Sequence, residues 1–96
     1  MDFGDVLKRM MLRPGDRGLR FARAGWRRKG AFIYLVSGRE VDADGWNGSP
    51  LTHREIERGR VRIEPHIDMC TADGTRVIGW TPTATDMLAD DWRVVE

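Results

Sequence analysis

The chain has 96 residues, of which 41% are hydrophobic and 32% are charged. This balance excludes a disordered chain, and the length leaves room for one domain. The single cysteine excludes an internal disulfide framework, and no apolar run approaches the roughly 20 residues that a membrane-spanning helix needs. We therefore expect one soluble, cytoplasmic domain over residues 1–96.

Charge is distributed unevenly along the chain. Residues 1–30 carry nine Lys/Arg against three Asp, whereas residues 31–96 carry seven Lys/Arg against twelve acidic residues. A basic first third suits an anionic ligand. A solvated, arginine-rich surface explains the same bias.

The first third predicts one helix and two strands. Apolar side chains at helical spacing predict an amphipathic helix over residues 3–12, which Arg13-Pro14-Gly15-Asp16 should end. Alternation over residues 19–23 predicts a half-buried strand, and the apolar run 31–36 predicts a more deeply buried one. Between them, G-W-R-R-K-G predicts a hairpin loop with one aromatic residue and three cations.

The middle of the chain is less regular. Residues 37–61 have the composition of a variable surface loop, within which a capping box starting at Thr52 opens a short helical turn. Residues 62–69 resume an extended pattern. Ala72-Asp73-Gly74 predicts a turn before a further strand over residues 75–80.

The last segment predicts a short helix containing Met87, with Thr83 or Thr85 as its N-cap, followed by a strand over residues 92–95. The sum is a small α+β domain, in which an N-terminal helix packs with an antiparallel sheet and a short late helix.

The stretch P-H-I-D-M-C-T-A-D-G raises the question of a metal or catalytic site. On a strand, His66, Asp68 and Cys70 share one face, and residues four apart lie about 13 Å apart, too far for a thiolate and its base. The one other histidine, His53, lies in the variable segment, and a zinc site needs three or four convergent ligands. We predict a scaffold hairpin, with no metal and no catalytic residue.

Two tryptophans lie among polar groups that suit a nucleotide-like ligand. Trp26 lies beside several cations, including Arg27 and Arg28, so a base could stack while phosphates meet guanidinium groups. Trp80 precedes a helix start rich in hydroxyls, which favours phosphate oxygens. The same residues also fit purely structural roles. Trp26 would anchor the core of the hairpin, and the hydroxyls after Trp80 would be ordinary helix caps. Trp92, in an alternating strand, is predicted to be core.

Several strings resemble a known family. F-G-D-V-L, F-A-R-A-G-W, G-A-F-I-Y-L-V, P-H-I-D-M-C-T-A-D-G and G-W-T-P-T-A-T-D-M-L-A-D-D-W-R-V-V look like the second Thoeris anti-defence family of small phage proteins. The resemblance covers residues 2–96 except 37–61, where Pro50-Leu51 alone is similar.

The resemblance implies a sponge rather than an enzyme. Family members bind a cyclic ADP-ribose isomer, of the glycocyclic type, without cleaving it, and so block Thoeris defence in the infected bacterial host cell. They are homotetramers, dimers of dimers, that hold the ligand between subunits without a cofactor. Some members also take cyclic dinucleotides at a separate site.

This ligand directs the choice of candidate residues. Trp26 and Trp80 are expected to stack on the ligand, and Arg27 or Arg28 to meet its pyrophosphate. The polar partners and apolar walls are expected to be Thr83, Thr85, Asp86, Phe32 and Met87. Relatives often carry Asn-Gly in place of Arg27-Arg28, and Ser-Gln in place of Thr83-Ala84. These departures leave open which cyclic nucleotide is preferred.

The residues leave alternatives open. A sponge for cyclic di- or trinucleotides of CBASS-type defence fits the same features. A phosphodiesterase would need a base, and usually a metal, that the sequence does not place convincingly. A nucleic-acid-binding module would use the basic first third, and its binding would depend steeply on salt.

Overall fold

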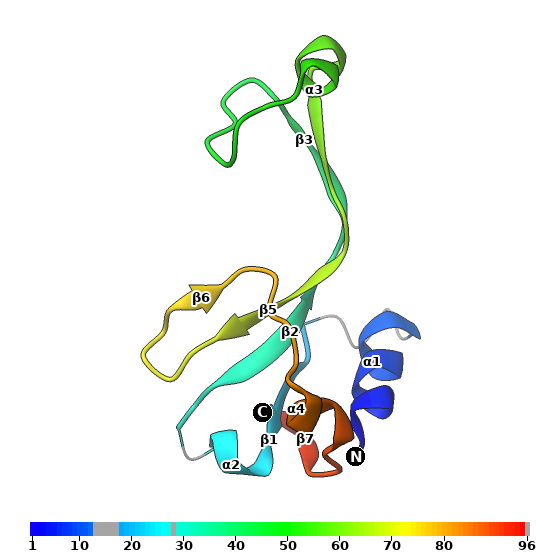
Figure 1. Ribbon diagram of the computed structural model, residues 1–96, viewed down its shortest axis with the longest axis vertical. Coiled ribbons are helices and arrows are strands. Elements are labelled where there is room, and N and C mark those ends of the chain that lie inside the picture. The colour runs from blue at the N-terminus through cyan, green and yellow to red at the C-terminus, as the bar shows by residue number, and fades with distance from the viewer. Residues whose placement is uncertain (13–17, 28, 96) are drawn as a thin grey trace.

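The computed structural model describes residues 1–12, 18–27 and 29–95, without the side chains of Leu12 and Arg27. It confirms the predicted α+β class: an N-terminal helix, an antiparallel sheet and a short late helix (Figure 1). The predicted helix stop at Arg13-Pro14-Gly15-Asp16 and the candidate Arg28 lie outside the described residues.

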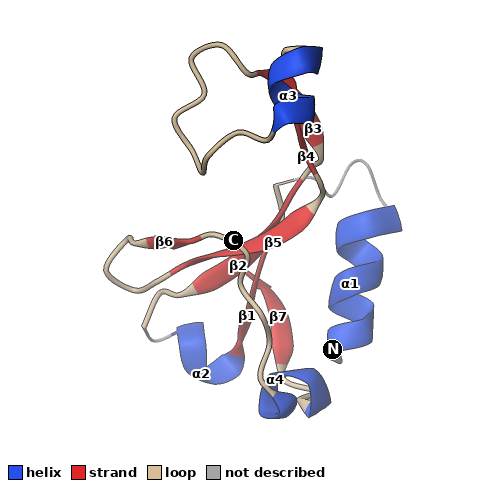
Figure 2. Ribbon diagram, turned by 45° about the horizontal axis from the view of Figure 1, so that its top comes forward, coloured by secondary structure: helices blue, strands red, loops and turns tan. Residues whose placement is uncertain are grey.

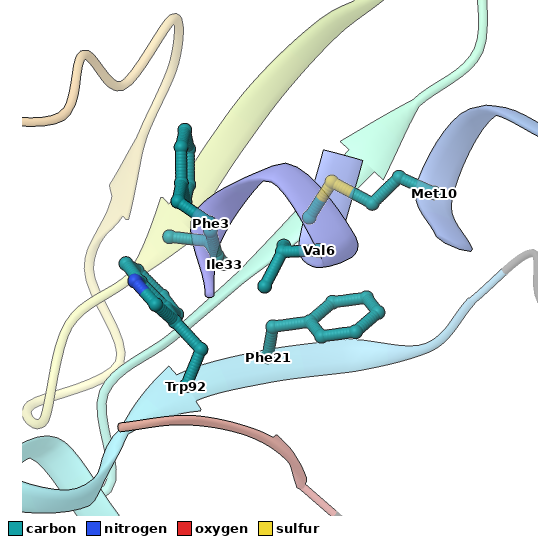
Figure 3. Packing of buried hydrophobic residues seen from close by; sticks show 6 residues of the cluster. All are labelled: Phe3, Val6, Met10, Phe21, Ile33 and Trp92. Atoms are coloured by element: carbon teal, nitrogen blue, oxygen red, sulfur yellow. The ribbon is translucent and has the colours of Figure 1, made fainter. Parts of the chain in front are cut away.

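Helix α1 (Phe3–Leu12) forms where its apolar spacing predicts it. One face buries Phe3, Val6 and Met10 against the sheet, while Asp5 in the first turn and Arg9 in the last complement the helix dipole. Figure 3 shows how these three side chains meet Phe21, Ile33 and Trp92, so that one helix face and the sheet close the core.

The main sheet has five antiparallel strands in the order β6-β5-β2-β1-β7. They are β1 (Arg20–Arg23), β2 (Phe32–Val36), β5 (His66–Cys70), β6 (Arg76–Val77) and β7 (Trp92–Val95). The strand predicted over residues 75–80 is therefore only two residues long. Its last part instead turns back across β5 through a hydrogen bond of 2.8 Å from Trp80 N to the Ile67 carbonyl.

The register fixes which side chains share a face of this sheet. Phe21 pairs with Ile33, and Ile33 with Met69, so these three apolar side chains lie on the face that α1 covers. Phe32, Tyr34, Asp68 and Cys70 alternate with them and lie on the opposite face, which we call the back face.

A separate arm projects from the domain (Figures 1 and 2). The strands β3 (Arg39–Asp42) and β4 (Arg60–Ile63) pair, and α3 (His53–Arg58) closes their far end. The interpretation of residues 37–61 as a surface loop was therefore incomplete, because strand pairing between Val41 and Val61 orders both ends of it. The predicted capping box is confirmed, with Thr52 and Glu55 bonding each other's backbone N–H groups.

Two boundaries differ from the sequence prediction, and a third is confirmed. The extended run 62–69 is two strands, because Glu64 and Pro65 separate β4 from β5 and proline gives no N–H to a ladder. The loop over residues 25–30 begins inside a helical turn, α2 (Ala24–Arg27). The late helix α4 (Ala84–Leu88) is confirmed, with Thr83 rather than Thr85 as its N-cap.

Candidate functional site

Four aromatic rings from distant parts of the chain meet at one end of the core. Trp26 lies edge-on to both Trp80 and Trp92, with ring centroids 5.9 and 5.1 Å away, and Trp80 lies 6.4 Å from Trp92. Phe3 of α1 contacts the two latter rings at 6.3 and 5.2 Å. Such edge-to-face pairs are favourable geometries. We call these four rings the aromatic cluster.

Within this cluster, Trp92 is fully buried, whereas Trp26 and Trp80 are only partly buried. Trp92 is the core residue that the sequence predicts. Trp26 and Trp80 form the outer side of the cluster, so the core role that the sequence left open holds for part of each ring. Their ligand role stays a prediction.

The turn that carries Trp26 is compact. The Trp26 carbonyl accepts hydrogen bonds of 2.9 Å from the backbone N–H groups of both Lys29 and Gly30, and Gly30 has a positive φ of 80°. A residue with a side chain would be strained in this conformation, which explains why a glycine suits this position. The Arg27 side chain and Arg28 are outside the described residues, so their predicted meeting with a pyrophosphate stays a prediction.

Trp80 is positioned by the stretch that first suggested a catalytic site. Asp68 is only 4% exposed, and its Oδ1 accepts a hydrogen bond of 2.9 Å from the backbone N–H of Gly79. His66 Nε2 lies 3.2 Å from the same oxygen. Asp68 therefore fixes the backbone next to Trp80, and the contact with His66 helps to hold the Asp68 carboxylate in place. This geometry agrees with the predicted scaffold role of the hairpin.

Helix α4 begins beside this cluster in a closed capping box. Thr83 Oγ1 accepts from the Asp86 N–H at 3.1 Å, and Asp86 Oδ2 accepts from the Thr83 N–H at 3.0 Å. The other oxygen, Oδ1, accepts from Arg23 Nη1 at 3.1 Å. Burial pushes the pKa of Asp86 upward, but the Thr83 hydrogen bonds and the Arg23 charge outweigh it, so the pKa lies below 3.8.

The other predicted contacts differ in their accessibility. Thr83 and Thr85 are exposed, and Met87 is 51% exposed, so all three can reach a ligand beside α4. Asp86 is only 7% exposed, and both of its carboxylate oxygens are already hydrogen-bonded within the protein. We therefore expect Asp86 to act on a ligand mainly by fixing the Thr83 hydroxyl.

Phe32 lies apart from this group, on the back face. Its ring is covered by Arg20, whose Cζ lies 5.2 Å from the ring centroid, and by Arg76 at 5.9 Å. Arg76 also lies 5.3 Å from the ring centroid of Tyr34. The structure therefore brings Trp26, Trp80 and α4 together but separates Phe32 from them, because strand alternation sends Phe32 and Ile33 to opposite faces.

An open groove of about 850 Å³ runs between α1 and the base of the arm. Its apolar walls include Leu7, Met10 and Ile67, and Arg39, Glu40, Arg62 and Glu64 supply charges of both signs. Trp80 lines it too, and among the predicted ligand residues whose side chains the structure describes it is the one that does so. The groove and the aromatic cluster therefore meet at Trp80.

The family model of the Thoeris anti-defense 2-like domain matches residues 1–95. The chain is also 30% identical over 95 residues to the protein "Thoeris anti-defense 2" of Bacillus phage SP01, an alignment that covers 99% of this chain and 94% of the relative. The chain belongs to the Thoeris anti-defense 2-like family.

Membership of the Thoeris anti-defense 2-like family confirms the resemblance that the sequence strings indicated and supports a role against Thoeris defence. Among the described residues, no helix has the length and apolarity to cross a membrane. In the same part of the chain, no three His, Cys, Asp or Glu side chains gather in a way that could hold a metal ion.

In this Thoeris anti-defense 2-like chain, sequence reasoning missed the residues that support the site. Arg23 was one cation among many in a basic third, and its two aspartate partners lie 63 and 68 residues away. The α1 residues of the groove were predicted only as part of an amphipathic helix, and its arm residues as part of a surface loop. No local signal in the sequence pointed to these contacts, because both aspartates lie far from Arg23 along the chain.

Proposed function

We propose that the protein binds and sequesters a cyclic ADP-ribose isomer, of the glycocyclic type, without cleaving it, and so blocks Thoeris anti-phage defence. The observation that carries this proposal is the pair Trp26–Trp80, half-buried and 5.9 Å apart, beside the hydroxyls of α4 in a chain of this family. We expect the protein to act in the cytoplasm of the infected bacterial host cell.

The chemistry of such a ligand matches the site. A cyclic ADP-ribose isomer presents an adenine face, two riboses and a pyrophosphate. The indole rings offer stacking surfaces, which are tolerant of base identity. The hydroxyls of Thr83 and Thr85 can exchange hydrogen bonds with ribose, Met87 offers an apolar wall, and Arg27 with Arg28 follows Trp26 directly in sequence.

We propose capture without catalysis. Cleavage of the signal would need a nucleophile or base poised at the ligand. The thiol of Cys70 lies on the back face, where its Sγ contacts the Thr71 carbonyl at 3.6 Å. The carboxylate of Asp86, next to the exposed threonines, is held by Arg23 and Thr83 and has a lowered pKa, which makes it a poor proton acceptor.

We propose a homotetramer, a dimer of dimers, as the active assembly. The groove along α1 is a natural place for a second copy, because its apolar walls and its balanced charges are self-complementary. Since Trp80 lines this groove, a neighbouring subunit there would stand next to the ligand site.

The deciding experiment is incubation of the protein with each cyclic ADP-ribose isomer, removal of free ligand, heating, and mass spectrometry of what is released. Release of the intact isomer supports the sponge. A linear product would identify an enzyme. Absence of any bound isomer at micromolar protein would overturn the proposed ligand class.

The back face favours a second ligand, a cyclic di- or trinucleotide at a separate site. Arg20 and Arg76 are exposed and lie over the rings of Phe32 and Tyr34, so their guanidinium groups are held in place for phosphates. Phe32→Ala should weaken capture of such a ligand and leave capture of a cyclic ADP-ribose isomer unchanged. Equal loss of both would contradict two separate sites.

A further inference from the structure

One arginine joins the separate parts of the candidate site. Arg23 ends β1, and the next residue, Ala24, begins the helical turn that carries Trp26. Its Nη1 lies 3.1 Å from Asp86 Oδ1, and its Nε lies 3.1 Å from Asp91 Oδ1. Its guanidinium group thus binds two aspartates, one in α4 and one in the segment that leads into β7.

Asp86 links Arg23 to the exposed start of α4. Its second carboxylate oxygen accepts a hydrogen bond from the Thr83 N–H, and its own N–H donates to the Thr83 hydroxyl. Its backbone carbonyl accepts a hydrogen bond of 3.0 Å from Trp92 Nε1. Every polar group of Asp86 is therefore engaged, and these bonds tie the helix start to Arg23 of β1 and Trp92 of β7.

Helix α4 depends on contacts with the rest of the domain to keep that orientation. It has five residues, which is too short to be stable alone in water, and Leu88 on it is 87% exposed. Asp91 completes the restraint from the other side, because its carbonyl accepts a hydrogen bond of 3.2 Å from the Ala24 N–H. The turn with Trp26 and the helix with Thr83 are thus tied to the same guanidinium group.

We infer that Arg23 is the positioning residue of the ligand site: it fixes the Trp26 turn and the exposed hydroxyls of α4 in one geometry without contacting the ligand itself. This inference rests on the proposed function. The Arg23 side chain is about three-quarters buried, and the two aspartates raise its pKa further, so the guanidinium group remains charged. A lysine retains the charge but lacks the planar fork that reaches two carboxylates at once.

The test compares Arg23→Lys and Arg23→Met with Arg58→Met. Arg58 forms an arginine–carboxylate pair of the same length, 3.1 Å to Glu40, but on the arm, so its loss controls for removal of an ion pair. Titration calorimetry with a cyclic ADP-ribose isomer is run at a temperature where thermal melts show each variant folded. Near-ultraviolet circular dichroism reports the packing of the tryptophans.

We expect Arg23→Lys to bind the isomer about tenfold more weakly, which corresponds to about 1.4 kcal/mol, and Arg58→Met to bind like wild type. The tryptophan signal of Arg23→Lys should change as well. A merely structural role would lower the melting temperature and leave the affinity of the folded protein unchanged. That result, in Arg23→Lys or in a folded Arg23→Met, would overturn the inference.

Failure of the proposed function gives a different pattern. If wild type binds no isomer, the ligand assignment is wrong, and the near-ultraviolet signal still tests the positioning role. A spectrum of folded Arg23→Lys identical to that of wild type would then overturn it.

Discussion

Trp92 Nε1 donates a hydrogen bond of 3.0 Å to the backbone carbonyl of Asp86. This bond joins the most buried indole of the core to the helix that presents Thr83 and Thr85. Because Trp92 also contacts Trp26 at 5.1 Å between ring centroids, the core and the candidate site are one packed unit. Changes in the core therefore affect the site through position.

Removing this hydrogen bond should destabilise the fold. Trp92→Phe leaves the Asp86 carbonyl without its buried donor, which costs about 1–3 kcal/mol in the free energy of unfolding, before the cost of lost packing. Trp46→Phe is the matched control, because Trp46 donates to the Ser49 carbonyl at an exposed position in the arm. Urea unfolding should show a clearly larger loss for Trp92→Phe. Equal losses would mean that the buried bond to Asp86 stabilises the fold no more than the exposed bond to Ser49 does.

Trp26→Ala should weaken capture of the signal while the protein remains folded. Base–aromatic stacking is worth about 1–3 kcal/mol, or roughly 5- to 150-fold in affinity. Since Trp26 is half-buried, its loss should lower the melting temperature less than Trp92→Ala does. Calorimetry with a cyclic ADP-ribose isomer and thermal melts separate the two effects. Unchanged affinity in Trp26→Ala would remove Trp26 from the site.

Much of the fold could be predicted from the sequence, because it depends on local patterns. The apolar spacing of α1, the continuous run of β2 and the capping box at Thr83 each follow from residues close in the chain. The arm could not be predicted, because β3 and β4 pair across 17 or more intervening residues and carry many charges. The length of β6 was overestimated, because Gly79 has a positive φ of 74° and its N–H donates to Asp68 rather than to a strand partner.

The candidate site was predicted in part. The sequence selected Trp26, Trp80 and the start of α4, and the structure brings these together. It could not place Phe32 on the opposite face without the strand register. Nor could it find Arg23 as the link to Asp86, because contacts between distant residues leave no local pattern.

Cys70 should be dispensable for capture. It is buried on the back face, away from the aromatic cluster, and its register partners are Phe32 and Arg76. Cys70→Ala should keep the affinity for the isomer within a few-fold, and Cys70→Ser should do the same with a somewhat lower melting temperature, since a hydroxyl is harder to bury than a thiol. Loss of binding in a folded Cys70→Ala protein would restore a role for the thiol.

Acid should remove the stabilisation that Asp86 provides. Its folded pKa lies below the ordinary 3.8, so its charged form stabilises the fold above that value, and this contribution is lost as the pH falls through the lowered folded pKa. Asp86→Asn should therefore be clearly less stable than wild type near neutral pH, and the difference should shrink below about pH 4. Urea unfolding across that range measures it. A difference independent of pH would show that the Asp86 charge does not matter.

The protein should form tetramers in solution. Its radius of gyration, 15.7 Å, exceeds the about 12.5 Å expected of a compact domain of this length, because the arm stands away from the core (Figure 1). A lone two-stranded ribbon is marginally stable in water, so contact with a neighbouring subunit would stabilise the arm. Met11, which lines the groove at the base of the arm, is 72% exposed.

Light scattering at micromolar concentration should give four times the chain mass. Met11→Glu should lower that mass by placing a charge in the groove, whereas Leu88→Glu, an exposed position outside the groove, should not. A monomeric wild type, or equal masses for both variants, would contradict assembly through this groove.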